Sequence, residues 1–237
     1  MKIRLFTIPN MLTLGNLLCG AYATVVLLTT GDFATALWLM VASAVFDFFD
    51  GFAARLLKST SAIGVQLDSL ADMISFGLVP SVALWVLYDS APQFMQMGEQ
   101  LANVMQYVTL IIVAFSALRL AKFNIDEEQH TEFIGLPTPA NGLLCLSFAA
   151  VAAAGELVLC KEVIAVFAIV MAVLLISPIR MFALKFKGFG WQGNELRYLF
   201  IIFAVAVACL FTRYAIPVII VAYIIVSAIR HAIILRK

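Results

Sequence analysis

The sequence contains little charge, and this shortage restricts what the protein can be. Only 12% of its 237 residues are charged, whereas 64% are hydrophobic and the mean hydropathy is +1.05. A soluble domain is typically about one quarter charged. So many apolar residues cannot all be buried in one water-soluble core of this size, which predicts that lipid surrounds the protein.

The sequence also lacks paired cysteines and the common catalytic motifs. Its four cysteines form no CxxC pair, so we interpret them as small hydrophobic packing residues. HExxH, P-loop and GxSxG motifs are absent. A GxGxxG match at 188–193 lies in a basic loop with no predicted strand before it, and it therefore does not predict a dinucleotide site.

Long continuous apolar segments predict an all-α, polytopic membrane bundle. Only helices and closed barrels satisfy their backbone hydrogen bonds in lipid, and these segments are too long for barrel strands. We expect one domain over residues 1–237 with about eight transmembrane helices, at 9–30, 33–57, 62–88, 102–123, 138–155, 161–179, 195–212 and 214–233.

Basic residues predict the orientation of this bundle. With both termini on one side, the other side holds only Lys161 and Arg213. The first side then collects Lys2, Arg4, Arg55, Lys58, Arg119, Lys122, Arg180, Lys185, Lys187, Arg197, Arg230, Arg236 and Lys237. Because Lys and Arg are concentrated in cytoplasmic loops, this bias predicts that both termini are cytoplasmic.

Four aspartates lie between two of the most apolar segments. Asp47 and Asp50 are three residues apart near the end of the second predicted helix, and Asp68 and Asp72 are four apart near the start of the third. Each pair therefore shares one helix face. The short connection at 58–62 makes the two helices antiparallel neighbours, so we expect all four carboxylates to meet in one pocket at the cytoplasmic membrane surface.

Four like charges in one pocket repel one another, and burial adds to the cost. Either some of them are protonated or a cation lies among them. Mg²⁺ combines carboxylates with substrate phosphates, and two ions sharing such ligands form a site for displacement at phosphorus. Structural acidic pairs, a cation or proton transporter and an intramembrane aspartyl protease are alternatives. A transport path would also need polar groups at the membrane midplane, where the other segments have almost no charge.

Four residues between the aspartates, Gly51, Ala53, Ala54 and Gly64, are small, which leaves room for a flat ligand against the backbone. The complete pattern is Asp-x2-Asp-Gly-x2-Ala-Arg-x8-Gly-x3-Asp-x3-Asp, formed by Asp47, Asp50, Gly51, Ala54, Arg55, Gly64, Asp68 and Asp72. It resembles the signature of the CDP-alcohol phosphotransferases, membrane enzymes that displace CMP from a CDP-linked substrate. Stretches at 8–20, 72–81, 117–124 and 135–142 are similar to the phosphatidylserine synthase branch, although Lys122 stands where that branch usually has arginine.

The resemblance implies CDP-diacylglycerol as substrate, L-serine as acceptor and two Mg²⁺ or Mn²⁺ ions as cofactors. It implies Asp47, Asp50 and Asp68 as metal ligands, with Asp72 shared between metal binding and general-base catalysis. The implied CDP-binding residues are Gly51, Ala54, Gly64 and Arg55, with Thr13 and Asn16 either joining this site or pairing helices by hydrogen bonds.

The acceptor site is expected at the cytoplasmic end of the fourth predicted helix. Arg119, Lys122 and Asn124 would hold the serine carboxylate or a lipid phosphate, unless they are simple membrane-surface anchors. Glycerol 3-phosphate and inositol phosphate are alternative acceptors, but their phosphate dianions call for more cationic side chains. The resemblance further implies a homodimer, and we expect a bacterial cytoplasmic membrane with the active site facing the cytoplasm.

Overall fold

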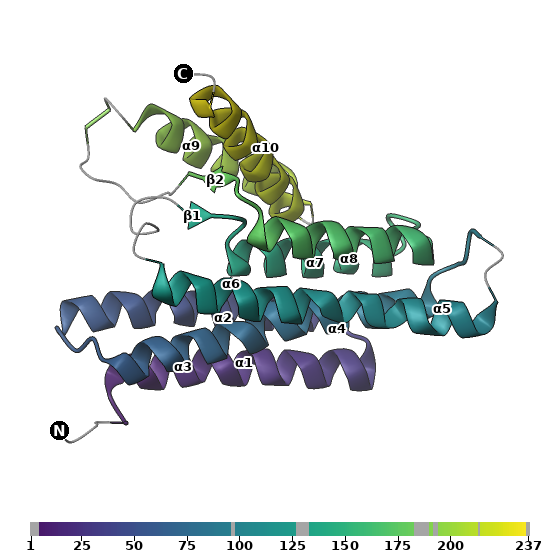
Figure 1. The fold of residues 1–237 in the computed structure, drawn as a ribbon, viewed down its shortest axis with the longest axis horizontal. Coiled ribbons are helices and arrows are strands. Elements are labelled where there is room, and N and C mark those ends of the chain that lie inside the picture. The colour runs from purple at the N-terminus through teal and green to yellow at the C-terminus, as the bar shows by residue number, and fades with distance from the viewer. Residues whose placement is uncertain are drawn as a thin grey trace.

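A computed structural model of the protein describes residues 5–95, 98–126, 133–182, 190–191, 194–212 and 214–235. Across these residues the chain forms a helical bundle with one short two-stranded sheet (Figure 1). The prediction of an all-α polytopic fold is confirmed. Most of the glycine-rich match at 188–193 lies outside the described residues. So do seven of the basic residues used to predict the orientation: Lys2, Arg4, Lys185, Lys187, Arg213, Arg236 and Lys237.

The first three predicted helices correspond to two regular helices and one composite rod. The regular helices are α1 (Ile8–Thr30) and α2 (Phe33–Leu56). The rod joins α3 (Ala62–Asp72), the π-helical segment η1 (Met73–Leu78) and α4 (Val79–Ser90) without a break. Its π-helical turn begins directly after Asp72 and was not predicted from the sequence.

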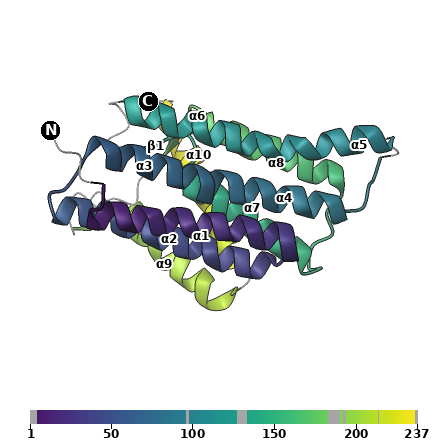
Figure 2. The same cartoon turned by 90° about the horizontal axis from the view of Figure 1, so that it is seen from below.

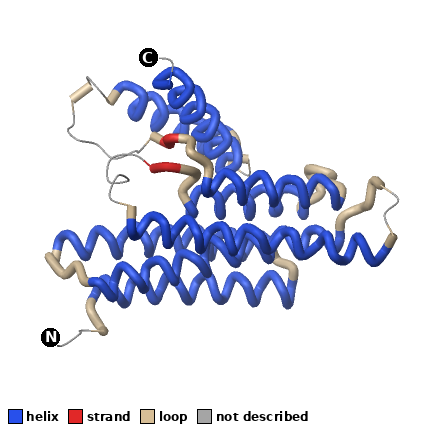
Figure 3. Tube along the Cα trace, in the orientation of Figure 1, coloured by secondary structure: helices blue, strands red, loops and turns tan. Residues whose placement is uncertain are grey.

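The remaining helices follow the predicted order, and a pair of short strands was not predicted. α5 (Glu99–Gln106), the 3₁₀ turn η2 (Tyr107–Leu110) and α6 (Ile111–Ile125) form one further rod. Strand β1 (Phe133–Ile134) precedes α7 (Thr138–Ala153) and α8 (Lys161–Ile176), and it pairs antiparallel with β2 (Arg180–Met181). The chain then forms α9 (Glu195–Leu210) and α10 (Ala215–Leu235), as the tube in Figure 3 shows.

Local capping residues explain where the helices near the aspartates begin. The Asp32 side chain accepts a hydrogen bond from the Thr35 amide at 3.0 Å and starts α2, just after Gly31 ends α1 with a left-handed φ of 63°. The Ser61 hydroxyl accepts from the Gly64 amide at 3.1 Å and starts α3. These contacts satisfy amide groups that a helix leaves unpaired at its start.

Five of the described helical rods are long and apolar enough to cross a membrane. They are Ile8–Thr30, Phe33–Leu56, Ala62–Ser90, Gln100–Ile125 and Ala215–Ile233. α7, α8 and α9 have 16 residues each. Many large apolar side chains point outward, including Trp38 at 74% exposure, as expected for surfaces that face lipid. The chain is an integral membrane protein.

The helices from α1 to α8 lie nearly parallel, whereas α9 and α10 cross them obliquely (Figures 1 and 2). The main apolar core includes Phe76, Leu84, Tyr88 and Leu146. α1 packs along α2 and also against α3 and η1. This arrangement brings the C-terminal half of α2 and the start of the α3 rod to the same end of the bundle.

Candidate active site

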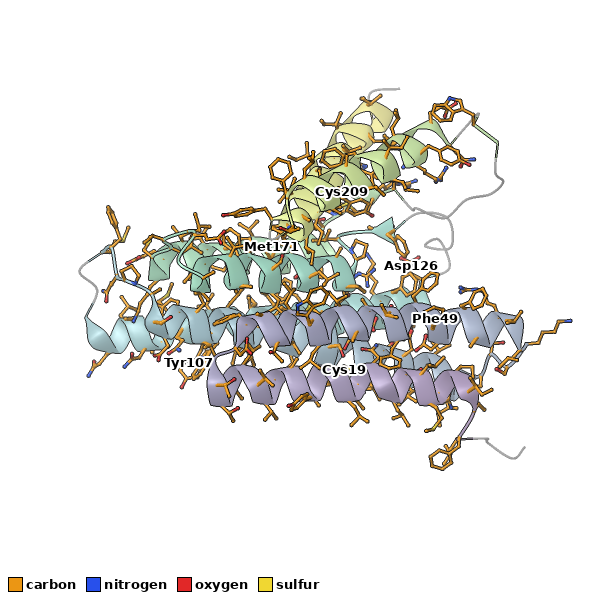
Figure 4. The ribbon with its side chains drawn as sticks, turned by 180° about the vertical axis from the view of Figure 1, so that it is seen from behind. Cys19, Phe49, Tyr107, Asp126, Met171 and Cys209 are labelled. Carbon is orange, nitrogen blue, oxygen red and sulfur yellow. The ribbon has the colours of Figure 1, made fainter. Side chains whose placement is uncertain are left out.

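The aspartates of α2 and α3 come together at this end of the bundle. Carboxylate oxygens of Asp47, Asp50 and Asp68 lie within 4.8 Å of one another. Asp72, one helical turn after Asp68, lies outside this group of three, and its charge acts on Asp47. Phe49, labelled in Figure 4, marks this part of α2. The four acidic side chains therefore form one cluster between two neighbouring helices.

Helix α1 holds one aspartate on each of these helices. The Thr13 hydroxyl donates to Asp50 Oδ2 at 2.6 Å, and Asn16 Nδ2 donates to Asp72 Oδ1 at 3.1 Å. All four of these residues are buried. Because Thr13 and Asn16 are three residues apart, they lie on the same face of α1 and reach both helices at once.

The cluster fits a hard divalent cation. Asp68 Oδ1 is buried without a hydrogen-bond partner in the described part of the chain. Neutral groups, Thr13 and Asn16, supply the hydrogen bonds that Asp50 and Asp72 accept. Clustered carboxylates in a low-dielectric region need positive charge to offset their repulsion, and carboxylate oxygens are the ligands that Mg²⁺ prefers. Asp47, Asp50 and Asp68 supply oxygens close enough to share one ion.

A pocket of about 120 Å³ opens beside the cluster. Gly51 and Ala54 of α2 and Gly64 of α3 line it, together with Thr13, Asp50 and Asp68. A Cβ on Gly64 would approach Ser61 Oγ to 3.2 Å and Asn10 Oδ1 to 3.3 Å, so a larger residue there would crowd the pocket wall. The small residues of the sequence pattern thus border an open space next to the carboxylates.

Two of the residues predicted to bind CDP do not line this pocket. Arg55 is exposed, with its Nη1 3.5 Å from where a Cβ on Gly51 would lie, which puts the guanidinium beside the pocket. Asn16 is fully buried and contacts Asp72 instead.

Sequence reasoning also missed several pocket residues: Asn10, Ser59, Thr60 and Ser61. Ser59 Oγ is buried without a hydrogen-bond partner among the described residues. Ser59, Thr60 and Ser61 belong to the short segment before α3 that was interpreted from the sequence only as the connection between two helices.

The three residues predicted to hold the acceptor have different environments. Arg119 is buried and donates from Nη1 to Thr138 Oγ1 at 2.8 Å, while its Nε has no partner among the described residues. Its positive charge acts on Asp72. Asn124 Nδ2 donates to Ser69 Oγ at 2.8 Å, and Lys122 is exposed. Only Arg119 combines burial, an unused donor and a link to the aspartate cluster.

The helices and the cluster define a polytopic membrane protein with a candidate divalent-metal centre beside a small-residue pocket. A comparison with protein-family models gives the more particular assignment. The model of the CDP-alcohol phosphatidyltransferase family matches residues 6–224. The chain therefore belongs to this family.

Several curated proteins are similar to this chain. A CDP-diacylglycerol–serine O-phosphatidyltransferase of Helicobacter pylori is 34% identical over 142 residues, which cover 59% of this chain and 56% of that protein. The Bacillus subtilis protein of the same name is 36% identical, with 60% of this chain and 75% of that protein covered. The Methanocaldococcus jannaschii protein, also of that name, is 31% identical over 75% of this chain and 74% of its own length. The match thus spans little more than half of the Helicobacter relative.

Proposed function

We propose that the protein transfers the phosphatidyl group of CDP-diacylglycerol to the hydroxyl of L-serine and releases CMP. The observation that carries this proposal is the convergence of Asp47, Asp50 and Asp68 beside a pocket bordered by glycine and alanine. The relatives' names support serine as the acceptor.

In this proposal the acidic cluster binds two Mg²⁺ or Mn²⁺ ions. Asp47, Asp50 and Asp68 hold them, and Asp72 contributes to the same site. Bound ions would supply charge neutralisation for the diphosphate and for the departing CMP. Thr13 keeps Asp50 in place through its 2.6 Å hydrogen bond. The orphaned Asp68 oxygen is a natural ligand position, because a cation would satisfy it.

The nucleotide end of the substrate occupies the pocket between α2 and α3. Gly51, Ala54 and Gly64 allow the cytidine to approach the backbone closely, and Arg55 beside the pocket pairs with a phosphate. The acyl chains extend into the surrounding lipid. This arrangement keeps the diphosphate against the carboxylate cluster.

Asp72 acts as the general base. A serine hydroxyl is a poor nucleophile. Its proton therefore passes to the Asp72 carboxylate while the serine oxygen attacks the lipid-side phosphorus. The new oxygen–phosphorus bond forms while the bond from that phosphorus to CMP breaks, and CMP leaves with the electron pair. Arg119 binds the serine carboxylate through its unused Nε, which places the serine hydroxyl near Asp72.

The site would face the cytoplasm of a bacterium, where serine is available. The Lys and Arg distribution of the sequence supports this orientation. We extend the proposal to a homodimer on the strength of the family resemblance.

An acceptor panel tests the proposal. Purified protein in detergent with Mn²⁺ and CDP-diacylglycerol would receive L-serine, glycerol 3-phosphate or inositol phosphate, and CMP release would be measured. We expect release with serine alone, together with a serine-containing lipid product. Release that required a polyol phosphate and ignored serine would contradict the acceptor assignment while leaving the family chemistry in place.

A further inference from the structure

Asn16 occupies an unusual position in the middle of α1. Its side chain is 0% exposed and lies outside the residues that line the pocket. Its Nδ2 donates to Asp72 Oδ1 at 3.1 Å. Its main-chain carbonyl accepts hydrogen bonds from the hydroxyls of Ser43 and Ser75, each at 3.0 Å. One residue therefore connects α1 with α2, η1 and the last residue of α3.

We propose that Asn16 is a positioning residue for Asp72. Its amide holds Asp72 Oδ1, so that Oδ2 remains the oxygen that accepts the proton of the attacking hydroxyl. This inference rests on the proposed function, in which Asp72 is the general base. In this role Asn16 orients the Asp72 carboxylate and does not contact the cytidine.

Packing alone does not explain an asparagine at this position. The Oδ1 atom of Asn16 is buried without a hydrogen-bond partner in the described part of the chain. Leaving a buried acceptor unsatisfied destabilises a fold, and an apolar side chain of similar shape would avoid that cost. The two serine hydroxyls bind the main-chain carbonyl, which any residue supplies. The side-chain amide is therefore needed because it donates a hydrogen bond to Asp72.

Close backbone packing fixes the position of this donor relative to Asp72 along the axis of α1. Gly20, one turn after Asn16, packs so closely against η1 that a Cβ there would lie 2.3 Å from Ser75 Oγ and 2.7 Å from Ser75 Cα. This contact prevents α1 from sliding along the rod that contains Asp72. The π-helical turn starts immediately after Asp72, and it brings Ser75 to the Asn16 carbonyl.

The inference is tested by comparing Asn16→Ala with Asn141→Ala. Asn141 is also 0% exposed, and its Nδ2 donates to the Met171 carbonyl at 2.8 Å, so both variants lose one buried amide donor. For each variant, the melting temperature, kcat, KM for CDP-diacylglycerol and half-saturating Mn²⁺ concentration would be measured with serine. We expect both to melt at lower temperature, whereas only Asn16→Ala lowers kcat, by about 10- to 100-fold.

The split between kinetic parameters distinguishes positioning from other roles. With Asn16→Ala, we expect KM for CDP-diacylglycerol and the Mn²⁺ requirement to stay close to those of the unmodified protein. A kcat equal to that of Asn141→Ala would overturn the inference. So would a Mn²⁺ requirement that rises in proportion to the loss of kcat, because Asn16 would then support the metal site.

A measurement on the unmodified protein covers the case in which Asn16→Ala does not fold. In an experimental structure with Mn²⁺ bound, we expect Asn16 Nδ2 to remain within hydrogen-bond distance of Asp72 Oδ1. Rotation of that oxygen away from Asn16 and onto the ion would overturn the inference. Failure of the proposed function is recognised separately, because the unmodified protein would then release no CMP with serine.

Discussion

At the scale of single residues, the four aspartates differ in what holds them. Asp50 accepts a hydrogen bond from Thr13 and Asp72 accepts one from Asn16, whereas Asp68 Oδ1 has no partner in the described chain. Burying an oxygen without a donor costs free energy, and a bound cation would offset that cost. Asp68 is therefore the residue whose change should report on metal binding directly.

We expect Asp68→Asn to lower CMP release by more than about 100-fold, because losing a direct ligand costs more than losing an outer hydrogen bond. The variant should still fold, since it removes one of several repelling charges. Thermal unfolding with and without Mn²⁺ would show a smaller metal-dependent rise in melting temperature than in the unmodified protein.

Asp89→Asn is a matched control, because Asp89 lies exposed near the far end of the same rod. It should change neither the activity nor the response to Mn²⁺. Substantial activity in Asp68→Asn would remove Asp68 from the proposed metal site.

Arg119 is the second residue whose surroundings make a specific prediction. Its planar guanidinium binds Thr138 from one nitrogen, and its Nε has no partner among the residues that the structure describes, a geometry that lysine cannot reproduce. We expect Arg119→Lys to raise KM for serine by on the order of tenfold and to leave KM for CDP-diacylglycerol unchanged, as steady-state kinetics would show. Arg180→Lys, at an exposed position on β2, is the control. An equal rise in both KM values would argue against a separate acceptor contact.

At the scale of elements, the η1 segment of the irregular rod contacts α1, α6 and α7 closely through small residues. Gly20 approaches Ser75, Gly77 approaches Ser116, and Gly142 approaches the backbone of Phe76. Small residues let helix backbones come close in membranes, where packing contacts drive association. The rod therefore places Asp68 and Asp72 through contacts that lie beyond the acidic cluster.

We expect Gly20→Ala to destabilise the protein by about 1–3 kcal/mol, because the new methyl group would overlap Ser75. The melting temperature should fall by several degrees, and kcat should fall with it because α1 carries Asn16. Gly98→Ala is the comparison, since a Cβ there meets nothing within 4 Å. Similar melting temperatures for the two variants would show that α1 can shift to accept the methyl group.

At the scale of the whole molecule, the orientation of the bundle in the membrane decides which compartment the site faces. α1 begins, α2 ends and α3 begins at the same end of the bundle, next to the aspartate cluster (Figure 1). The proposed chemistry requires this end to face the compartment that contains serine. The opposite end includes the connection that follows α4.

Labelling from one side of sealed vesicles tests this orientation. Cys19, Cys160 and Cys209, which are exposed or partly exposed, would be replaced, and the buried Cys145 would be kept. One accessible cysteine at a time would then be introduced as Lys58→Cys or Gln93→Cys, both at exposed positions. We expect a membrane-impermeant maleimide to label Lys58→Cys only in inside-out vesicles and Gln93→Cys only in right-side-out vesicles. The opposite pattern would place the site outside the cytoplasm.

Much of the fold follows from local features of the sequence. Helix limits near the aspartates were predicted to within a few residues from the apolar segments alone. This was possible because the residues that cap these helices in the structure, Gly31, Asp32 and Ser61, lie at the edges of the apolar segments. The meeting of α2 and α3 carboxylates was predicted for the same reason, since a short connection leaves neighbouring helices few alternatives.

The sequence by itself determined a membrane helical bundle and an acidic cluster at one connection, because hydrophobic length and helical spacing are local properties. Only the tertiary structure decided that Asn16 binds Asp72 across 56 residues, that Thr13 binds Asp50 across 37, and that Arg119 but not Lys122 turns inward. In a chain whose helices are apolar on nearly every face, periodicity does not specify which faces pack together. Close contacts such as that of Gly20 with Ser75 set the rotation and height of each helix, and these decide which polar side chains meet.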